Sequence, residues 1–332
     1  MHRLLLGLIV CTATIAQDAL VRTELGVLNH GRPVLDAHNC YPYEGRWGDR
    51  IDRALSQGFP VAIEQDIAWS IDPSGRGRPV VSHTTKTNGT EPTLREYFFE
   101  HVRPIVEQAL AANDRARWPL IILHFDFKSS EPQVLHAVWD LLGEYESWLT
   151  TAPNTARPSD VAAFDLKPIL AITEDSDAQE EVFYRQVPPG GRLRVFGSAH
   201  TQGMDKGSRE ERAHLAATLL PETLLTEPPT NYRRWWNNSW WEVEEGGQTK
   251  AGEWTVAKDR RLRALVNRAH ELGYWIRFYT LDGFARPETR GWDAGYNFGS
   301  RDAVLVRWRA AIGAGVDFIA TDQYEGLAEA MK

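Results

Sequence analysis

The stretch "PVAIEQDIAW", residues 60–69, places two carboxylates inside an apolar run that otherwise has the composition of a buried strand. Side chains alternate between the two faces of a strand, so Glu64 and Asp66 point to the same face. Two like charges about 4 Å apart repel by roughly 4 kcal/mol at an effective dielectric constant near 20. The stretch therefore predicts a proton, a cationic side chain or a metal ion beside these carboxylates.

Short apolar runs of this kind alternate with amphipathic segments along the chain. The runs that we expect to be strands cover residues 34–37, 61–67, 120–127, 169–172, 193–197, 223–226, 275–280 and 318–321. The segments between them include "RWGDRIDRALSQG", "TLREYFFEHVRPIVEQALAAN", "EPQVLHAVWDLLGEYESWL", "DRRLRALVNRAHELG" and "SRDAVLVRWRAAIGAG", several of which end on glycine as helices often do. Eight alternating units favour a closed (β/α)8 TIM barrel over an open doubly wound sheet. No linker or repeat interrupts the pattern, which indicates a single domain.

The composition suits a globular protein. The 332 residues are 42% apolar and include 13 tryptophans, enough for a sizeable core. The formal net charge is −8, and no basic run with interleaved aromatic residues occurs, so we do not expect nucleic acid as a partner. No transmembrane span is expected either, and nothing in the composition predicts the oligomeric state.

The N-terminal stretch "MHRLLLGLIVCTATIAQDA" has the pattern of a secretory signal peptide. Arg3 precedes an apolar run, and small residues precede Gln17, which predicts a signal peptide at residues 1–16 and a domain at residues 17–332. The alternative is a buried first helix. With the leader removed, Cys40 is the single cysteine and cannot form an internal disulfide. These features predict a secreted or periplasmic protein.

In a (β/α)8 barrel the active site lies at the carboxyl ends of the strands. The first predicted strand ends in "VLDAHN", which places His38 and Asn39 at that rim. After the second strand, "GRPVVSHTT" can return as a small hairpin that carries His83 over the barrel mouth. The third strand, "LIILHFDFK", places Asp126 and Lys128 on its inner face by alternation. His124 lies one layer deeper on that face and is expected to be a core or supporting residue.

Several short motifs together resemble the phosphatidylinositol phospholipase C-like phosphodiesterase superfamily, which includes the glycerophosphodiester phosphodiesterases. The motifs are "AHN", "IEQDI", "VVSH", "FDFK", "YTLDG" and "VDFIATD", in this order along the chain. They look closest to a branch that includes the altered inheritance of mitochondria protein six, and the Asp-x-Lys on the third strand is similar to that of spider-venom sphingomyelinase D. The spacings are 26 residues from His38 to Glu64, 17 from Asp66 to His83 and 43 from His83 to Asp126.

The resemblance implies that His38 and His83 are the acid and base, and that Glu64, Asp66 and Asp126 bind a divalent cation. A site made only of carboxylate oxygens suits a hard ion, Mg²⁺ or Ca²⁺, better than zinc. Histidine suits proton transfer because its reference pKa lies near 6.5.

Three further residues are expected to contact the substrate phosphate: Lys128, Asn39 and Arg277. Asn39 stands where glycerophosphodiesterases have arginine, and this departure counts against glycerophosphodiesters specifically. Arg277, which points inward on the seventh strand in "WIRFYT", can supply the missing guanidinium or can instead pair with a buried carboxylate. His200 and Glu174 also fall at rim positions by strand logic, although the resemblance gives them no role. Asp322 matches the closing Thr-Asp of the family, where a structural role is one possibility.

Residues 230–254 carry five tryptophans and are expected to follow the sixth strand, over the barrel mouth. Such a segment can line a headgroup pocket or fold onto the barrel as a lid.

Together with the resemblance, the sequence predicts a secreted, metal-dependent phosphodiesterase that acts on a small-molecule or lipid phosphodiester. Catalysis would use two histidines, with a cyclic phosphate as an intermediate or product. The alternatives are a sphingomyelinase D-like phospholipid lyase and a non-catalytic glycan-binding barrel.

Overall fold

The computed structural model describes residues 32–43, 46–72, 74–129, 131–204, 206–245, 247–285 and 297–332. Within these ranges eight parallel strands form a closed barrel, in the order β1, β2, β4, β6, β8, β9, β10 and β11, and β1 closes it by pairing with both β2 and β11. Their bounds are Val34–Ala37, Val61–Ile71, Ile121–Phe127, Ile169–Thr173, Val195–Ser198, Arg233–Ser239, Trp275–Tyr279 and Phe318–Thr321. The predicted (β/α)8 barrel is confirmed. The predicted signal peptide lies outside the described residues.

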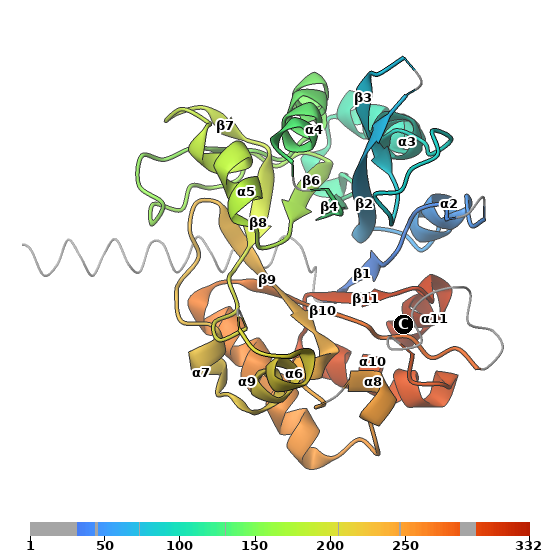
Figure 1. Ribbon diagram of the computed structural model, residues 1–332, viewed down its shortest axis with the longest axis vertical. Helices are drawn as coiled ribbons and strands as arrows, with labels where there is room; N and C mark the ends of the chain where they lie inside the picture. The colour runs from blue at the N-terminus through green and yellow to red at the C-terminus, as the bar shows by residue number, and fades with distance from the viewer. Residues whose placement is uncertain are drawn as a thin grey trace, which may run out of the picture.

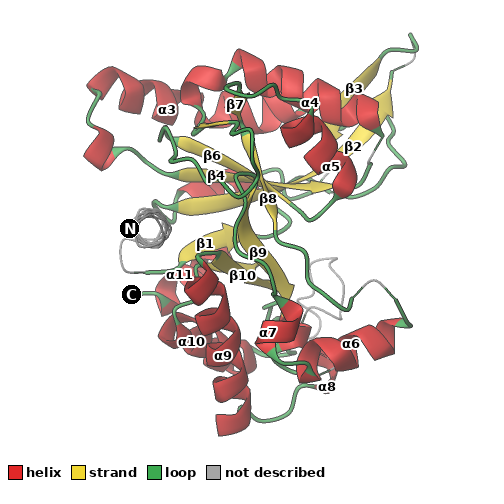
Figure 2. Ribbon diagram, turned by 90° about the vertical axis from the view of Figure 1, so that its left-hand side faces the viewer, coloured by secondary structure: helices red, strands yellow, loops and turns green. Residues whose placement is uncertain are grey.

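Helices surround the barrel on the outside (Figure 2). The longer ones are α3 (Glu100–Ala112), α4 (Pro132–Glu144), α6 (Arg209–Thr218), α9 (Val256–Leu272) and α10 (Arg301–Ala314). The shorter helical segments are α2 (Arg50–Leu55), η1 (Arg95–Phe99), η2 (Arg115–Arg117), η3 (Glu146–Trp148), α5 (Asp177–Glu180), η4 (Glu181–Arg185), α7 (Pro221–Leu224), η5 (Trp240–Glu242), α8 (Gly247–Lys250) and α11 (Tyr324–Ala330). Gly273 and Gly315 end α9 and α10 with φ of 100° and 83°, a backbone conformation that glycine adopts without strain.

Three strands lie outside the barrel. β3 (Gly77–Val81) pairs antiparallel with the far end of β2, as the predicted hairpin requires, while β5 (Ala152–Pro153) and β7 (Arg192–Leu193) form a separate pair. Figure 1 shows β3 beside the part of β2 that extends beyond the barrel. The hairpin is important for the site because His83 lies two residues after the end of β3.

The predicted sixth strand at residues 223–226 is wrong. Pro221 occupies the first turn of a helix there, and α7 covers Pro221–Leu224. The sixth barrel strand is β9, which lies inside the tryptophan-rich segment. The prediction failed because a short apolar run can form either a strand or a helical turn, and because the polar residues of "RRWWNNS" concealed the real strand.

The part of the tryptophan-rich segment that forms β9 is therefore a strand of the barrel wall. Trp235, Trp236 and Trp240 are completely buried. The indole of Trp235 donates to the backbone oxygen of Thr173, at 3.0 Å, and its ring contacts that of His124 at a centroid distance of 5.1 Å. Because β4 and β9 are not neighbours, this contact crosses the barrel interior.

The barrel interior is layered. Aromatic side chains from β9, β10 and β11 meet near its amino-terminal end, where Phe318 contacts both Trp235 and Trp275. Above them lies a polar layer that includes Asp36, Arg277 and His124, all at most 1% exposed. The apolar base makes the barrel a solid core, so the polar side chains can be reached by solvent only from the carboxyl ends of the strands.

Candidate active site

Three carboxylates meet at the carboxyl ends of β2 and β4. The strand register sets Asp66 directly opposite Asp126, with Glu64 one layer deeper on the same face. One oxygen from each carboxylate lies within 4.8 Å of the other two. The predicted gathering of Glu64, Asp66 and Asp126 is thus present in the structure.

Lys128 supplies a positive charge beside two of these carboxylates. Its Nζ lies 2.6 Å from Asp126 Oδ2 and 3.1 Å from Asp66 Oδ2. Burial would lower the pKa of the Lys128 ammonium, but the neighbouring carboxylates raise it above its ordinary value. The cationic partner expected from the strand sequence is therefore present. Of the three predicted phosphate contacts, Lys128 is the one whose side chain contacts two of these carboxylates.

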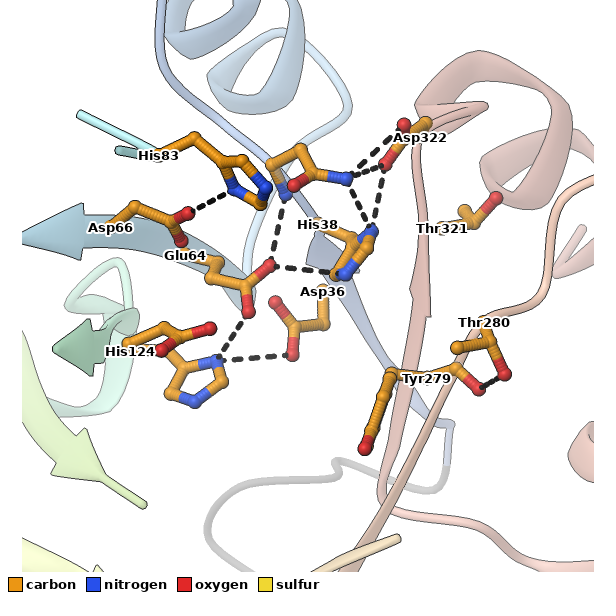
Figure 3. A network of polar contacts seen from close by, with 12 residues as sticks. Asp36, His38, Glu64, Asp66, His83, His124, Tyr279, Thr280, Thr321 and Asp322 are labelled. Carbon is orange, nitrogen blue, oxygen red and sulfur yellow. Dashed lines mark hydrogen bonds and ion pairs between the residues drawn. The ribbon is translucent and has the colours of Figure 1, made fainter. Parts of the chain in front are cut away.

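His38 lies directly after β1 on the other side of Glu64 (Figure 3). Its Nδ1 is 2.8 Å from Asp322 Oδ1, and its Nε2 is 3.7 Å from Glu64 Oε2. The hydroxyl of Tyr324 donates to the backbone oxygen of His38, and the ring of Tyr279 stacks against the imidazole at a centroid distance of 6.4 Å. Burial would lower the pKa of His38, but the carboxylates of Glu64 and Asp322 raise it to about 9.

His83 reaches the same group of carboxylates from the β2–β3 hairpin. Its Nδ1 lies 2.7 Å from Asp66 Oδ2 and 3.0 Å from the hydroxyl of Tyr41. The His83 side chain is 45% exposed, whereas that of His38 is only 8% exposed. The two predicted histidines therefore sit at the same rim, each with its own carboxylate partner and in different solvent environments.

Asn39 connects the two histidines. Its φ of 52° is a left-handed conformation that asparagine tolerates better than most residues, and its backbone N–H donates to Glu64 Oε2 at 2.9 Å. The Asn39 side-chain amide donates to Asp322 at 3.0 Å, and its oxygen accepts from Tyr41 at 2.5 Å. Asn39 is 5% exposed, so in this structure its side chain orders the residues around it.

Arg277 lies beneath Glu64 and is 1% exposed. Its guanidinium donates to Asp36, donates to Asn237 Oδ1 at 3.0 Å, and lies 3.5 Å from Glu64 Oε1. Burial would lower the pKa of Arg277, but Asp36 and Glu64 raise it above its usual value. The position matches the alternative expectation, in which a buried arginine pairs with carboxylates.

The structure places two acids beside His38: Asp322, for which the sequence suggested a structural role, and Asp282, for which it suggested none. Asp322 orients the imidazole, and Asp282 accepts from the backbone N–H of Asp322 at 2.7 Å and from Thr321 Oγ1 at 2.7 Å. Burial and the nearby Asp322 charge raise the pKa of Asp282 to about 7. Both acids follow the carboxyl ends of β10 and β11, and their rim position was the available signal.

The carboxylate oxygens fit a hard divalent cation. Oxygens bound to one Mg²⁺ or Ca²⁺ at 2.0–2.6 Å are at most about 4–5 Å apart, which agrees with the 4.8 Å limit for Glu64, Asp66 and Asp126. Within the described ranges a second such group contains His38, Asp282 and Asp322, which differs in offering one imidazole nitrogen beside two carboxylate oxygens. Among the described residues, no helix is both long and apolar enough to cross a bilayer.

No protein-family profile matches this sequence, and no curated protein matches it either. Among solved structures, a glycerophosphoryl diester phosphodiesterase from Parabacteroides distasonis is similar over 90% of this chain and 86% of its own, with 12% identity and a TM-score of 0.40. A triple mutant of Plasmodium falciparum HPPK-DHPS with pteroate is similar over 91% of this chain and 48% of its own, with 11% identity and a TM-score of 0.42. Similarities this low carry no argument about activity.

Proposed function

We propose that this chain is a divalent-cation-dependent phosphodiesterase of the phosphatidylinositol phospholipase C-like superfamily. One observation carries the proposal: Glu64, Asp66 and Asp126 gather at the barrel mouth with a histidine beside two of them, His83 at 2.7 Å from Asp66 and His38 at 3.7 Å from Glu64. Carboxylates that can hold a hard cation, together with two proton carriers, are the groups that phosphoryl transfer needs.

Glu64, Asp66 and Asp126 would hold Mg²⁺ or Ca²⁺. When bound, the ion would neutralise charge on the phosphoryl oxygens in the transition state. Lys128 would add a second positive contact to the phosphate, since its ammonium lies within 3.1 Å of both Asp66 and Asp126 and its side chain is partly exposed. Asn39 would act by fixing His38 and Glu64, and Arg277 would act from below by holding Glu64.

The two histidines would divide the proton transfers between them. One imidazole takes the proton of the attacking hydroxyl, which belongs to the substrate or to a water molecule, and the other gives a proton to the oxygen of the leaving alcohol. Asp322 and Asp66 each face one Nδ1, which fixes the ring orientation and directs Nε2 away from its carboxylate. Attack by a hydroxyl of the substrate itself yields a cyclic phosphate, which water can then open. A diester without such a hydroxyl would be attacked by water directly.

The same residues would serve a sphingomyelinase D-like lyase, which differs only in releasing the cyclic product. A glycan-binding barrel is less well supported, because Trp235, Trp236 and Trp240 are buried and present no flat surface to a sugar. Secretion through cleavage after residue 16 is a further part of the proposal, and N-terminal sequencing of the exported protein tests it.

Hydrolysis of bis-p-nitrophenyl phosphate tests the proposed function. Wild-type protein should release p-nitrophenol, EDTA should abolish this release, and Mg²⁺ or Ca²⁺ should restore it. A double variant, His38→Ala with His83→Ala, should be inactive while retaining its fold. Activity that survives both EDTA and the double substitution would refute the proposal.

A further inference from the structure

Glu174 is held at the barrel mouth by donors from two other strands. It follows β6, and its Oε1 lies 2.8 Å from His124 Nε2 while its Oε2 accepts from Asn237 Nδ2 at 2.7 Å. Its side chain is nevertheless 27% exposed, whereas that of His124 is fully buried. Both carboxylate oxygens are therefore fixed, and part of the group still faces solvent.

The groups that hold Glu174 are themselves fixed from below. Asn237 Oδ1 accepts from Arg277, so the Asn237 amide is oriented with its nitrogen toward Glu174. Arg277 also bonds Asp36, and His124 Nδ1 lies 3.8 Å from Asp36 Oδ2, which closes a ring of polar groups beneath the mouth. Exposed carboxylates need no such support, because water satisfies them.

This ring also places Glu174 close to the proposed reaction centre. The His124 imidazole lies between Glu174 and Glu64. Its Nε2 is 2.8 Å from Glu174 Oε1, and its Nδ1 is 3.9 Å from Glu64 Oε1. Figure 3 shows His124 beside Glu64 and Asp36, on the opposite side of Glu64 from His38. A phosphodiester bound at Glu64 would have one of its two alcohol groups within reach of Glu174.

We infer that Glu174 is a specificity residue that binds a hydrogen-bond donor, a hydroxyl or a primary ammonium, on one alcohol group of the phosphodiester. The inference rests on the proposed function. A carboxylate has about four acceptor positions, and the protein uses one on each oxygen, so acceptor positions on the exposed side remain for a ligand. A rim built this way favours alcohols that donate hydrogen bonds over those that cannot, because unpaired polar groups are costly.

The experiment compares p-nitrophenyl phosphodiesters that differ in the second alcohol. The 2-aminoethyl and glyceryl esters carry donors, whereas bis-p-nitrophenyl phosphate and the choline ester carry no N–H or O–H donor. Glu174→Gln removes the charge with little change in shape, and Asp177→Asn removes an exposed charge three residues further along as the matched control. Every measurement uses the full chain with Mg²⁺ present.

We expect Glu174→Gln to lower kcat/KM by about 10- to 100-fold on the donor-bearing esters and by less than about threefold on the other two. Asp177→Asn should leave all four values unchanged. The aminoethyl and glyceryl esters distinguish an ammonium from a hydroxyl as the group bound. An equal loss on all four esters would overturn the inference and make Glu174 a support for His124 alone. Failure of the wild-type protein on bis-p-nitrophenyl phosphate would instead refute the proposed function.

Discussion

Replacement of Asp322 by asparagine tests how the fold prepares His38 for proton transfer. Asp322 is 4% exposed, and its Oδ1 lies 2.8 Å from His38 Nδ1 and 3.0 Å from the Asn39 amide nitrogen. A carboxylate can only accept at this position, so it keeps a proton on Nδ1 and leaves Nε2 to exchange protons on the Glu64 side. Asparagine retains the shape but can present an N–H to His38, which reverses the tautomer.

The expected loss follows from the bond that is removed. A hydrogen bond to a charged group contributes about 1.5–3 kcal/mol, and each 1.4 kcal/mol is a tenfold change in rate. If the bond acts fully in the transition state, kcat should fall by about 10- to 150-fold, and the reversed tautomer should add to this loss. KM should change little, because Asp322 lies behind the imidazole and does not face the substrate.

The assay follows turnover by phosphorus NMR, with the best substrate from a panel of glycerophosphodiesters, lysophospholipids and inositol phosphodiesters. Their alkyl leaving groups require protonation, so both histidines are needed whichever one is the acid. Asp302→Asn, at an exposed position in the first turn of α10, is the control for loss of one carboxylate. A kcat for Asp322→Asn within threefold of wild type, with an unchanged melting temperature, would refute this account of His38.

Three further predictions concern proton transfer and stability. His38→Ala and His83→Ala should differ in activity on bis-p-nitrophenyl phosphate, because the leaving group of this substrate needs no proton. The variant that lacks the general acid should keep most of its activity on bis-p-nitrophenyl phosphate but lose its activity on alkyl diesters. Equal losses of activity in the two variants on both kinds of substrate would contradict the division of roles. Burial raises the pKa of Glu242 to about 8, so the fold favours its neutral form and the free energy of unfolding should fall as pH rises from about 4.5 to 8. In urea denaturation, the free energy of unfolding of Glu242→Gln should fall by roughly 4 kcal/mol less than that of wild type between pH 4.5 and 8. Parallel curves of unfolding free energy against pH for the two proteins would contradict this prediction. Trp235→Ala should lower the free energy of unfolding by about 3–5 kcal/mol in the same assay, because it leaves a cavity in a fully buried site; a cost under 1 kcal/mol would contradict the packing described.

Most of the fold could be predicted because it depends on local patterns. The runs that begin at Val61, Ile169 and Trp275 are rich in β-branched or aromatic residues, and each forms a barrel strand. The sixth strand escaped prediction because arginine and asparagine occupy four of its seven positions, and tertiary contacts decide its conformation. Arg233, at its start, pairs with Asp175 and Glu180 on neighbouring elements, which no local pattern can indicate.

The candidate site was predictable where strand geometry alone determines it. Glu64 and Asp66 share a face because strands have a period of two, and Asp126 joins them because parallel neighbours end at the same rim. The pairing of His38 with Asp322 was not predictable, since 284 residues separate them and only barrel closure through β1 and β11 brings them together. How deep each inward-pointing side chain lies in the barrel was not predictable either, because this depth depends on the register between neighbouring strands.

Metal binding tests most directly whether Glu64, Asp66 and Asp126 hold a hard dication. The measurement is titration of EDTA-treated protein with Mn²⁺, followed by electron paramagnetic resonance of the free ion. We predict one bound Mn²⁺ per chain, displaced by excess Mg²⁺ or Ca²⁺, with binding weakened at least about tenfold in Asp126→Asn and unchanged in the surface control Asp302→Asn. Wild-type protein that binds no Mn²⁺, or Asp126→Asn protein that binds it as tightly as wild type, would contradict the account.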